Sequence, residues 1–275
     1  MSLMWKLLMS STAATLILSA NSFNLEDFIK KNIVTNPNVK VESVKLIEKR
    51  DVPYAKGWKA YMFVMNLKYK NRHDAFPETI FVNEEKGLVT QSLMNYKKKI
   101  DYKYALKPKL PDSFYDEKHL VAGNKNAKHK IVLFSDPECP FCRMQVPEII
   151  KAAKDNPDKL AVYYYHMPLM QIHPAAFTLT KIMEYLQKKG EHDKAFKMYR
   201  ADVAGMKDEK KIIEKVNQQF GLNLTQKDIN KKEIIDAIKE DMKSAASMMV
   251  RGTPTIYYDG EFDESHEKYK EAIKK

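Results

Sequence analysis

Hydrophobic and polar positions alternate most clearly between residues 58 and 69. Single residues separate the apolar positions, and some of these intervening residues are polar, such as Asn66 and Lys68. The apolar positions are Tyr61, Phe63, Met65, Leu67 and Tyr69. Successive side chains of a β-strand point to opposite faces of a sheet, so a period of two is typical of a strand with one buried face. The pattern therefore predicts a half-buried strand in the N-terminal half of the chain.

The rest of this half carries shorter patterns of the same kind. A polar turn ending in Gly87 separates the last two apolar runs. A helix followed by an antiparallel meander is typical of a small α+β domain, which we expect over residues 23–107. It contains no cysteine and no recognisable catalytic constellation. The expected elements are a short amphipathic helix over residues 25–33 and strands over 39–48, 58–69, 79–82 and 88–90.

The next stretch is rich in lysine, proline and glycine. Ten lysines and four acidic residues lie between residues 97 and 130. No helix-turn-helix, zinc-finger or base-stacking motif accompanies this charge, so we interpret it as a solvated surface and expect no nucleic-acid partner. Pro108 and Pro111 favour a hydrated linker over residues 108–127, with one short helix over 112–121.

The C-terminal half begins with a continuous apolar run, Ile131-Val132-Leu133-Phe134, which predicts a buried strand. Helical patterns follow, with glycines at their ends, and an Asp259-Gly260 pair marks a tight turn. Together they predict a domain over residues 128–275 that mixes strands with several helices. The expected strands cover residues 131–134, 160–166 and 255–258, and the expected helices cover the stretch after Cys142 and residues 172–189, 194–200, 207–220, 230–247 and 264–274.

The first residues have the composition of an export signal. Lys6 precedes a stretch of apolar and small residues from Leu7 to Ala20, which is short for a membrane span. Small residues follow, so we predict a signal peptide over residues 1–22 and a mature chain beginning near Phe23. An uncleaved anchor and a buried helix are the alternatives. Export would bring the chain into an oxidising compartment.

The candidate chemistry lies directly after the strand at residues 131–134. Cys139 and Cys142 are the only cysteines among 275 residues, and Cys139 stands where a helix is predicted to begin. Unpaired N–H groups and the macrodipole at a helix N-terminus favour an anion such as a thiolate. Pro140 suits the first helical turn. We therefore expect Cys139 to be the exposed attacking thiol and Cys142 to resolve the mixed disulfide.

Two other interpretations of the cysteine pair are weaker. A structural disulfide across so short a loop would constrain the unfolded chain very little. A metal site would need two more ligands, and the sequence has no second C-x-x-C or His-x-x-x-His motif. A redox-active pair is the interpretation that we favour.

Two motifs resemble the thioredoxin superfamily. Cys139-Pro140-Phe141-Cys142, with Pro147 five residues later, is similar to its active-site helix. The run from Val250 to Ile256, with Thr253-Pro254 at its centre, resembles its cis-proline loop. The threonine before the proline is similar to the Dsb disulfide isomerases of the bacterial periplasm. The preceding Arg-Gly and the long helical insertion resemble DsbA-like oxidases.

The resemblance implies an α+β protein: a thioredoxin fold with a helical insertion, preceded by a small α+β dimerisation domain and a linker. It implies a periplasmic thiol:disulfide isomerase or reductase, acting as a homodimer with some chaperone activity, without cofactor or metal. Its partners would be exported clients with thiols or disulfides and a membrane redox protein, either a DsbD-like reductase or a DsbB-like oxidase. The implied site comprises the redox-active Cys139–Cys142 pair, the Pro140-Phe141 dipeptide between them, and Thr253 with cis Pro254 as the substrate-binding loop.

The sequence departs from the family at one position. Many relatives carry a buried carboxylate six residues before the first cysteine, where this chain has Leu133. Asp136 and Glu138 lie closer and could accept a proton from Cys142, but such residues more often cap a helix, which we favour. We interpret His173 as structural and leave it out of the site. A DsbA-like dithiol oxidase and a holdase chaperone without redox role remain the alternative functions.

Overall fold

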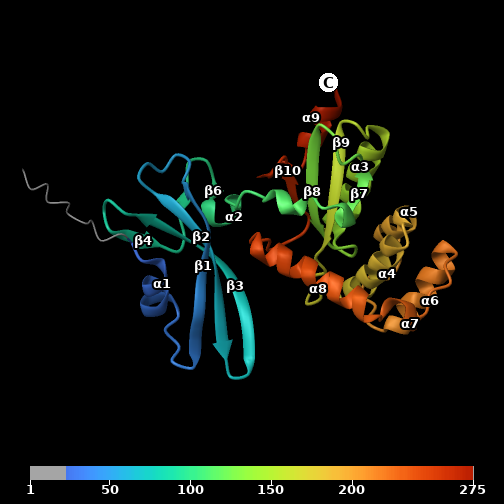
Figure 1. The fold of residues 1–275 in the computed structure, drawn as a ribbon, viewed down its shortest axis with the longest axis horizontal. Helices are drawn as coiled ribbons and strands as arrows, with labels where there is room; N and C mark the ends of the chain where they lie inside the picture. The colour runs from blue at the N-terminus through green and yellow to red at the C-terminus, as the bar shows by residue number, and fades with distance from the viewer. Residues whose placement is uncertain (1–22, 275) are drawn as a thin grey trace, which may run out of the picture.

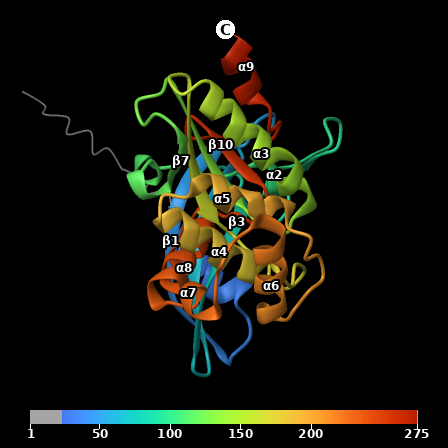
Figure 2. The ribbon, with the colours of Figure 1, turned by 90° about the vertical axis from the view of Figure 1, so that its right-hand side faces the viewer.

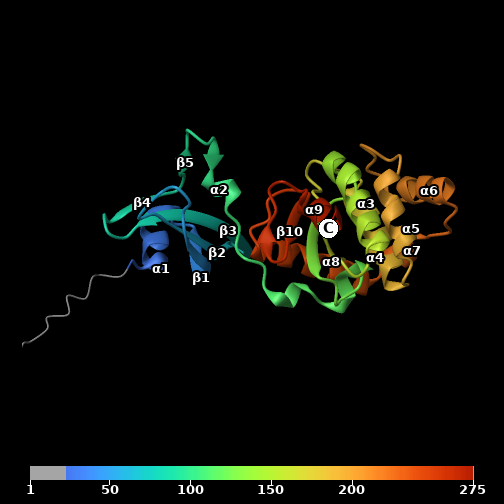
Figure 3. The same cartoon turned by 90° about the horizontal axis from the view of Figure 1, so that it is seen from above.

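A computed structural model describes residues 23–274, and the predicted signal peptide at residues 1–22 lies outside these residues. The chain forms two bodies side by side, each built on its own main sheet (Figures 1 and 3). A connecting segment in extended and turn conformation joins them. The first body holds the N-terminal elements, and the second holds the cysteines.

The N-terminal body is an antiparallel meander with the strand order β1-β2-β3-β4. Phe63 and Ile80 are fully buried on the face covered by the first helix, where Ile29 packs against them. This arrangement follows the period-two pattern seen in the sequence. Its elements are α1 (Leu25–Phe28), a π-helical turn (Ile29–Ile33), β1 (Val39–Asp51), β2 (Lys59–Tyr69), β3 (Arg72–Asn83) and β4 (Leu88–Thr90).

A small two-stranded unit and one helical turn complete this body. Tyr102 begins the helical turn and is buried beside Val52, Ala60 and Phe81 in a second apolar cluster. The unit comprises β5 (Met94–Asn95), β6 (Ile100–Asp101) and α2 (Tyr102–Ala105).

The second body contains a five-stranded sheet with the order β11-β10-β8-β9-β7. The central pair β8 and β9 is parallel, and β10 pairs with β8 in the antiparallel sense. Parallel neighbours need a crossover, which the helix after β8 supplies. The strands are β7 (Leu120–Gly123), β8 (His129–Ser135), β9 (Leu160–His166), β10 (Thr255–Tyr258) and β11 (Glu261–Phe262).

The helices of this body include an insertion between β9 and β10, which lies in front of the sheet in Figure 2. Asp208 caps the N-terminus of α6, and Gly221 ends that helix with a positive φ of 64°. Among residues 23–274 no helix is long and apolar enough to cross a membrane. The helical elements are α3 (Pro140–Asp155), α4 (Ala176–Lys188), α5 (His192–Phe196), a 3-10 turn (Lys197–Arg200), α6 (Glu209–Phe220), α7 (Gln226–Ile229), α8 (Lys232–Ser247) and α9 (Lys268–Lys274).

Both faces of the five-stranded sheet are buried. Leu133 and Tyr164 belong to the apolar cluster shared with α3 and the inserted helices. Phe134 and Tyr165, one residue further along the same strands, belong to the cluster on the opposite face. The continuous apolar runs of β8 and β9 are thus explained by burial on both sides.

The segment predicted as a linker differs from expectation. No helix spans residues 112–121; two 3-10 turns, Asp112–Phe114 and Glu117–His119, are present instead. Residues 120–123 form β7, an edge strand of the five-stranded sheet, so this part is packed rather than hydrated. Gly123 marks a close approach, because a Cβ atom there would lie 1.8 Å from the Leu160 carbonyl oxygen. A four-residue strand between turns gives too little alternation to be recognised in the sequence.

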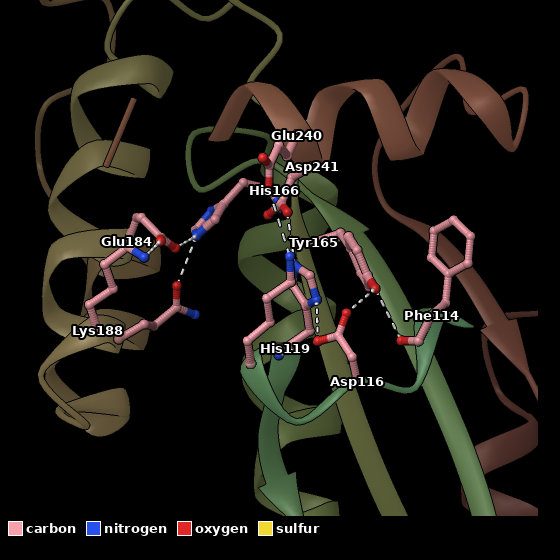
Figure 4. A network of polar contacts seen from close by, with 11 residues as sticks. Phe114, Asp116, His119, Tyr165, His166, Glu184, Lys188, Glu240 and Asp241 are labelled. Atoms are coloured by element: carbon pink, nitrogen blue, oxygen red, sulfur yellow. Dashed lines mark hydrogen bonds and ion pairs between the residues drawn. The ribbon is translucent and has the colours of Figure 1, made fainter. Parts of the chain in front are cut away.

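A polar network fastens α8 to the end of β9 (Figure 4). Asp241 accepts a hydrogen bond from the His166 backbone N–H at 2.9 Å, and its other oxygen lies 2.9 Å from His119 Nε2. His119 Nδ1 lies 2.7 Å from Asp116, and the Tyr165 hydroxyl contacts the same segment. These contacts join the connecting segment, the sheet and the last inserted helix.

Candidate functional site

The two cysteines lie at the start of α3, as the sequence predicts. Cys139 is the N-cap residue and Pro140 follows in the first turn. Cys139 is less exposed than predicted, because only 4% of its surface is exposed. Cys142, one helical turn further on, is 0% exposed. The cis-proline loop covers Cys139, a long-range contact that the local sequence does not reveal. Both cysteines are free thiols in this structure.

The environment of Cys139 favours its thiolate. The Cys142 thiol donates a hydrogen bond to the Cys139 sulfur, and the backbone N–H groups of Cys142 and Phe141 donate as well. These contacts outweigh burial and lower the pKa of Cys139 from 9.0 to about 5. At neutral pH Cys139 is therefore a thiolate, the form that attacks disulfides.

Cys142 has the opposite character. Burial raises the pKa of its thiol, and its hydrogen bond to the Cys139 sulfur raises it further. The Asp136 backbone N–H and the Ser135 hydroxyl partly offset this by hydrogen-bonding the Cys142 sulfur. Cys142 is thus held as a protonated thiol whose proton stabilises its neighbour, which matches the roles expected of an attacking and a resolving cysteine.

The predicted cis-proline loop lies against Cys139. The Thr253–Pro254 peptide bond is cis. The Cys139 sulfur lies 3.2 Å from the Thr253 carbonyl oxygen, to which it can donate a hydrogen bond only in its protonated form. The buried Thr253 hydroxyl helps to lower the pKa of Cys139, although it makes no hydrogen bond of normal geometry. Residues that are far apart in sequence are thereby brought together at one sulfur.

The two nearby carboxylates act as structural acceptors. Asp136 accepts from the backbone N–H of Leu169 at 2.8 Å and lies 2.7 Å from His173 Nδ1. Glu138 accepts from the Ala175 N–H at 2.7 Å. These contacts tie the active-site loop, residues 136–138 just before Cys139, to the segment after β9. Neither acid caps α3, whose N-terminus has no side-chain cap, so the capping interpretation is wrong: both carboxylates accept from other segments instead. The structural interpretation of His173 agrees with its contact to Asp136.

Several apolar side chains near the cysteines face solvent. Phe141, between the cysteines, is 64% exposed, and Ile172 is 69% exposed. Met144 and Met170 are exposed as well. Because Asp136 and Glu138 fasten the segment carrying Met170 and Ile172 to the active-site loop, these side chains offer an apolar surface beside the reactive sulfur.

Sequence reasoning missed a contact between the cis-proline loop and the N-terminal body. Arg251, two residues before Thr253, donates from Nη2 to the Glu78 carboxylate at 3.1 Å. Glu78 lies on β3 and also pairs with Lys103 at 3.0 Å. Burial opposes ionisation, but the Thr79 N–H and these two cations hold the pKa of Glu78 below its usual value. No local signal pairs positions so distant in sequence.

No metal site emerges from the described residues. Within residues 23–274 no group of three or more His, Cys, Asp or Glu side chains is arranged to hold an ion. A polar cleft of about 590 Å³ lies beside α8, and Glu184, Asp241 and His119 line it. These side chains already contact one another or the backbone through the network of Figure 4.

The chain belongs to the thioredoxin family: the family model described as Thioredoxin matches residues 116–275, more than half of its length. The predicted α+β class, with a thioredoxin fold and a helical insertion, is confirmed. The family match begins at residue 116, earlier than the predicted start of the second domain at residue 128.

Similar curated proteins fall into two groups. The chain is 26% identical over 149 residues to the Na(+)/H(+) antiporter NhaA 1 of Mycobacterium sp. (strain KMS), an alignment covering 52% of this chain and 24% of the antiporter. The chain thus spans about a quarter of that relative's length. It is 22% identical over 164 residues to the probable disulfide bond formation protein D of Bacillus anthracis, covering 56% of this chain and 76% of that protein.

Two solved structures are similar to part of this chain. A thioredoxin-like oxidoreductase from Silicibacter pomeroyi DSS-3 is 18% identical, with a TM-score of 0.47. The match covers 58% of this chain and 93% of the oxidoreductase chain. DsbA2 of Pseudomonas aeruginosa is 24% identical and covers 55% and 90%, with a TM-score of 0.42.

Proposed function

We propose that this protein catalyses thiol–disulfide exchange in exported proteins and acts on them as an isomerase or reductase. One observation carries the proposal: a low-pKa Cys139 at a helix start, beside a protonated Cys142 and the Thr253–Pro254 loop. This arrangement supplies a nucleophile, a resolving thiol and a backbone segment for the client.

The exchange cycle uses the two sulfurs in turn. The Cys139 thiolate attacks one sulfur of a client disulfide, the client S–S bond breaks, and a Cys139–client disulfide forms as one client thiolate leaves and takes up a proton. In isomerisation that client thiolate, or another, attacks the mixed disulfide, restores the Cys139 thiolate and closes a new client bond. In reduction Cys142 attacks Cys139 instead, so the client is released with two thiols and the protein becomes oxidised.

The client would be held beside the reactive sulfur. Backbone next to Pro254 can pair with an extended client segment like an added strand. The exposed side chains of Phe141, Met144, Met170 and Ile172 can contact apolar residues of an incompletely folded client. Both contacts favour unfolded chains over compact native ones.

The N-terminal body supports the isomerase proposal. β1 is an edge strand of 13 residues and pairs only with β2 among the described strands. Leu46 on β1 and Phe76 on β3 are each more than two-fifths exposed. An open edge and exposed apolar residues favour self-association, so we propose a homodimer through residues 23–107 in which two sites face one client.

A DsbA-like dithiol oxidase is the second candidate. A low pKa of the attacking thiol stabilises the reduced form and makes the disulfide more oxidising. The name of the Bacillus anthracis relative, a probable disulfide bond formation protein, points the same way. The redox partner in a membrane would be DsbB-like for an oxidase and DsbD-like for an isomerase or reductase. For both candidates we propose export to the periplasm.

The two candidates differ in the redox state maintained in cells. Acid quenching followed by thiol labelling should find Cys139 and Cys142 reduced if the protein is an isomerase or reductase. The purified full-length protein should also refold a substrate whose native disulfides are non-consecutive. A pair trapped as a disulfide, with poor rescue of that substrate, would contradict the isomerase proposal and favour the oxidase.

A further inference from the structure

Among residues 23–274, no carboxylate is placed to assist the buried resolving thiol. Leu133 occupies the position six residues before Cys139, and its side chain is fully buried in the same apolar cluster as both cysteines. The Asp136 carboxylate is occupied by the Leu169 N–H and by His173. Cys142 must nevertheless lose its proton whenever it attacks the mixed disulfide. Another group has to stabilise the charge that develops on its sulfur.

Three buried hydroxyl groups form a continuous chain that ends at Cys142. The Ser135 hydroxyl is close enough to the Cys142 sulfur to lower the pKa of that thiol by hydrogen bonding. Ser135 Oγ lies 2.6 Å from the Tyr199 hydroxyl, and the Tyr199 hydroxyl lies 2.7 Å from the Tyr164 hydroxyl. All three residues are at most 2% exposed. They come from the end of β8, from β9 and from the 3-10 turn of the helical insertion, so the fold rather than local sequence assembles them.

The protons of the three hydroxyl groups can all point toward the Cys142 sulfur. Each hydroxyl has a single proton, so if Ser135 donates to Cys142, Tyr199 must donate to Ser135 and Tyr164 to Tyr199. Burial raises the pKa of both tyrosines well above their usual value, which keeps them protonated as donors. Aligned hydrogen bonds strengthen one another in a low-dielectric interior.

We propose that Ser135 is a catalytic residue that stabilises the Cys142 thiolate during resolution, and that Tyr199 and Tyr164 are positioning residues that orient its hydroxyl. The inference rests on the proposed exchange function. In the step concerned, Cys142 attacks the Cys139 sulfur of a mixed disulfide. The Cys142–Cys139 bond forms, the Cys139–client bond breaks, and the client thiolate leaves with the electron pair. The client gains the proton that Cys142 loses, and Ser135 stays protonated throughout.

The reaction of the reduced full-length protein with one equivalent of dithiobis(nitrobenzoate) separates the two steps. Attack by Cys139 releases the first thionitrobenzoate, and attack by Cys142 on the resulting mixed disulfide releases the second. Ser135→Ala should leave the first phase unchanged and slow the second roughly tenfold to a hundredfold, the factor for a lost hydrogen bond to a charged group. Tyr199→Phe should slow the second phase by a smaller factor of about two, and Tyr164→Phe by less.

Tyr165→Phe is the matched control. Tyr165 is also buried on β9, but its hydroxyl donates to the Phe114 carbonyl oxygen on the opposite face of the sheet. Its second phase should keep the wild-type rate. Both tyrosine-to-phenylalanine variants near Cys142 retain the aromatic ring, so they test the hydroxyl groups if Ser135→Ala folds poorly.

The outcomes separate this inference from the proposed function. A wild-type protein that releases both equivalents, with unchanged second phases in Ser135→Ala and Tyr199→Phe, would overturn the hydroxyl chain and leave the exchange function standing. An equal slowing in Tyr165→Phe would also overturn it, because the effect would then be general. A wild-type protein that releases only one equivalent would contradict the exchange cycle itself, and the role of Ser135 with it.

Discussion

The two sheets of this protein are covered to very different extents. Every residue of β9 is buried, whereas no residue of β1 is. The five-stranded sheet has apolar clusters on both faces and holds Cys139 and Cys142 in fixed surroundings. The N-terminal sheet has a long open edge instead. A fully covered sheet fixes reacting atoms, and a partly covered sheet leaves surface for another chain.

Substitution of the two cysteines, which lie beside the fully covered sheet, should have the largest effect on disulfide exchange. Cys139→Ser should reduce disulfide exchange to the uncatalysed background, because a serine hydroxyl is not ionised at neutral pH. Cys142→Ser should instead accumulate mixed disulfides with clients. Non-reducing gels of trapped complexes would distinguish the two. We expect both variants to remain folded at neutral pH. A Cys139→Ser protein that still forms complexes through Cys142 would reverse the assignment.

Removing the N-terminal body, which holds the partly covered sheet, should have the next largest effect on the rearrangement of disulfides. A fragment beginning near Pro108 keeps both cysteines, the cis-proline loop and all strands of the five-stranded sheet. We expect it to be monomeric by light scattering and to oxidise dithiols, yet to rescue a substrate with non-consecutive disulfides poorly. A full-length monomer, or a fragment that isomerises as well as the whole chain, would contradict the role given to residues 23–107.

Local sequence patterns predicted some elements of the second body and missed others. Strong patterns predicted the central strands, and the C-x-x-C motif with its following proline predicted the start of α3. The strand β7 was missed because four residues next to turns resemble a linker. The burial of Cys139 was missed because the loop that covers it is distant in sequence.

The remaining omissions also concern long-range contacts. Arg251 and Glu78 meet only when the two bodies are assembled. Ser135, Tyr164 and Tyr199 look like ordinary strand and helix residues until three elements bring their hydroxyl groups together. Local patterns carry no information about such pairings.

The contact between the two bodies should contribute a smaller free energy. Arg251 and Glu78 are each little more than a quarter exposed, and exposed ion pairs typically contribute about 0.2–1 kcal/mol. A double-mutant cycle with Glu78→Gln and Arg251→Gln should find a coupling near the upper end of that range. The more exposed Lys270–Glu267 pair on α9 serves as the control, with a coupling near zero. Equal couplings for both pairs would argue against a specific link to the cis-proline loop.

The lowered pKa of Cys139 also predicts a pH dependence of stability in the reduced protein. The pKa of Cys139 is lowered to about 5 in the folded state, while in the unfolded chain it should lie near the ordinary 9.0. The unfolded state therefore binds more protons between these values, so the contribution to stability grows as pH rises and is complete above pH 9. It disappears as pH falls through about 5. Unfolding midpoints of the reduced wild type minus those of Cys139→Ser should increase across this range, and a constant difference would contradict the lowered pKa.

The central claim is that Cys139 is a thiolate nucleophile supported by a protonated Cys142. The most direct test is the rate of alkylation of the reduced protein by iodoacetamide as a function of pH, with the labelled cysteine identified by mass spectrometry. We predict that only Cys139 is labelled and that its rate rises with a midpoint near the pKa of about 5. A midpoint near the ordinary thiol value of 9.0, or faster labelling of Cys142, would contradict the claim.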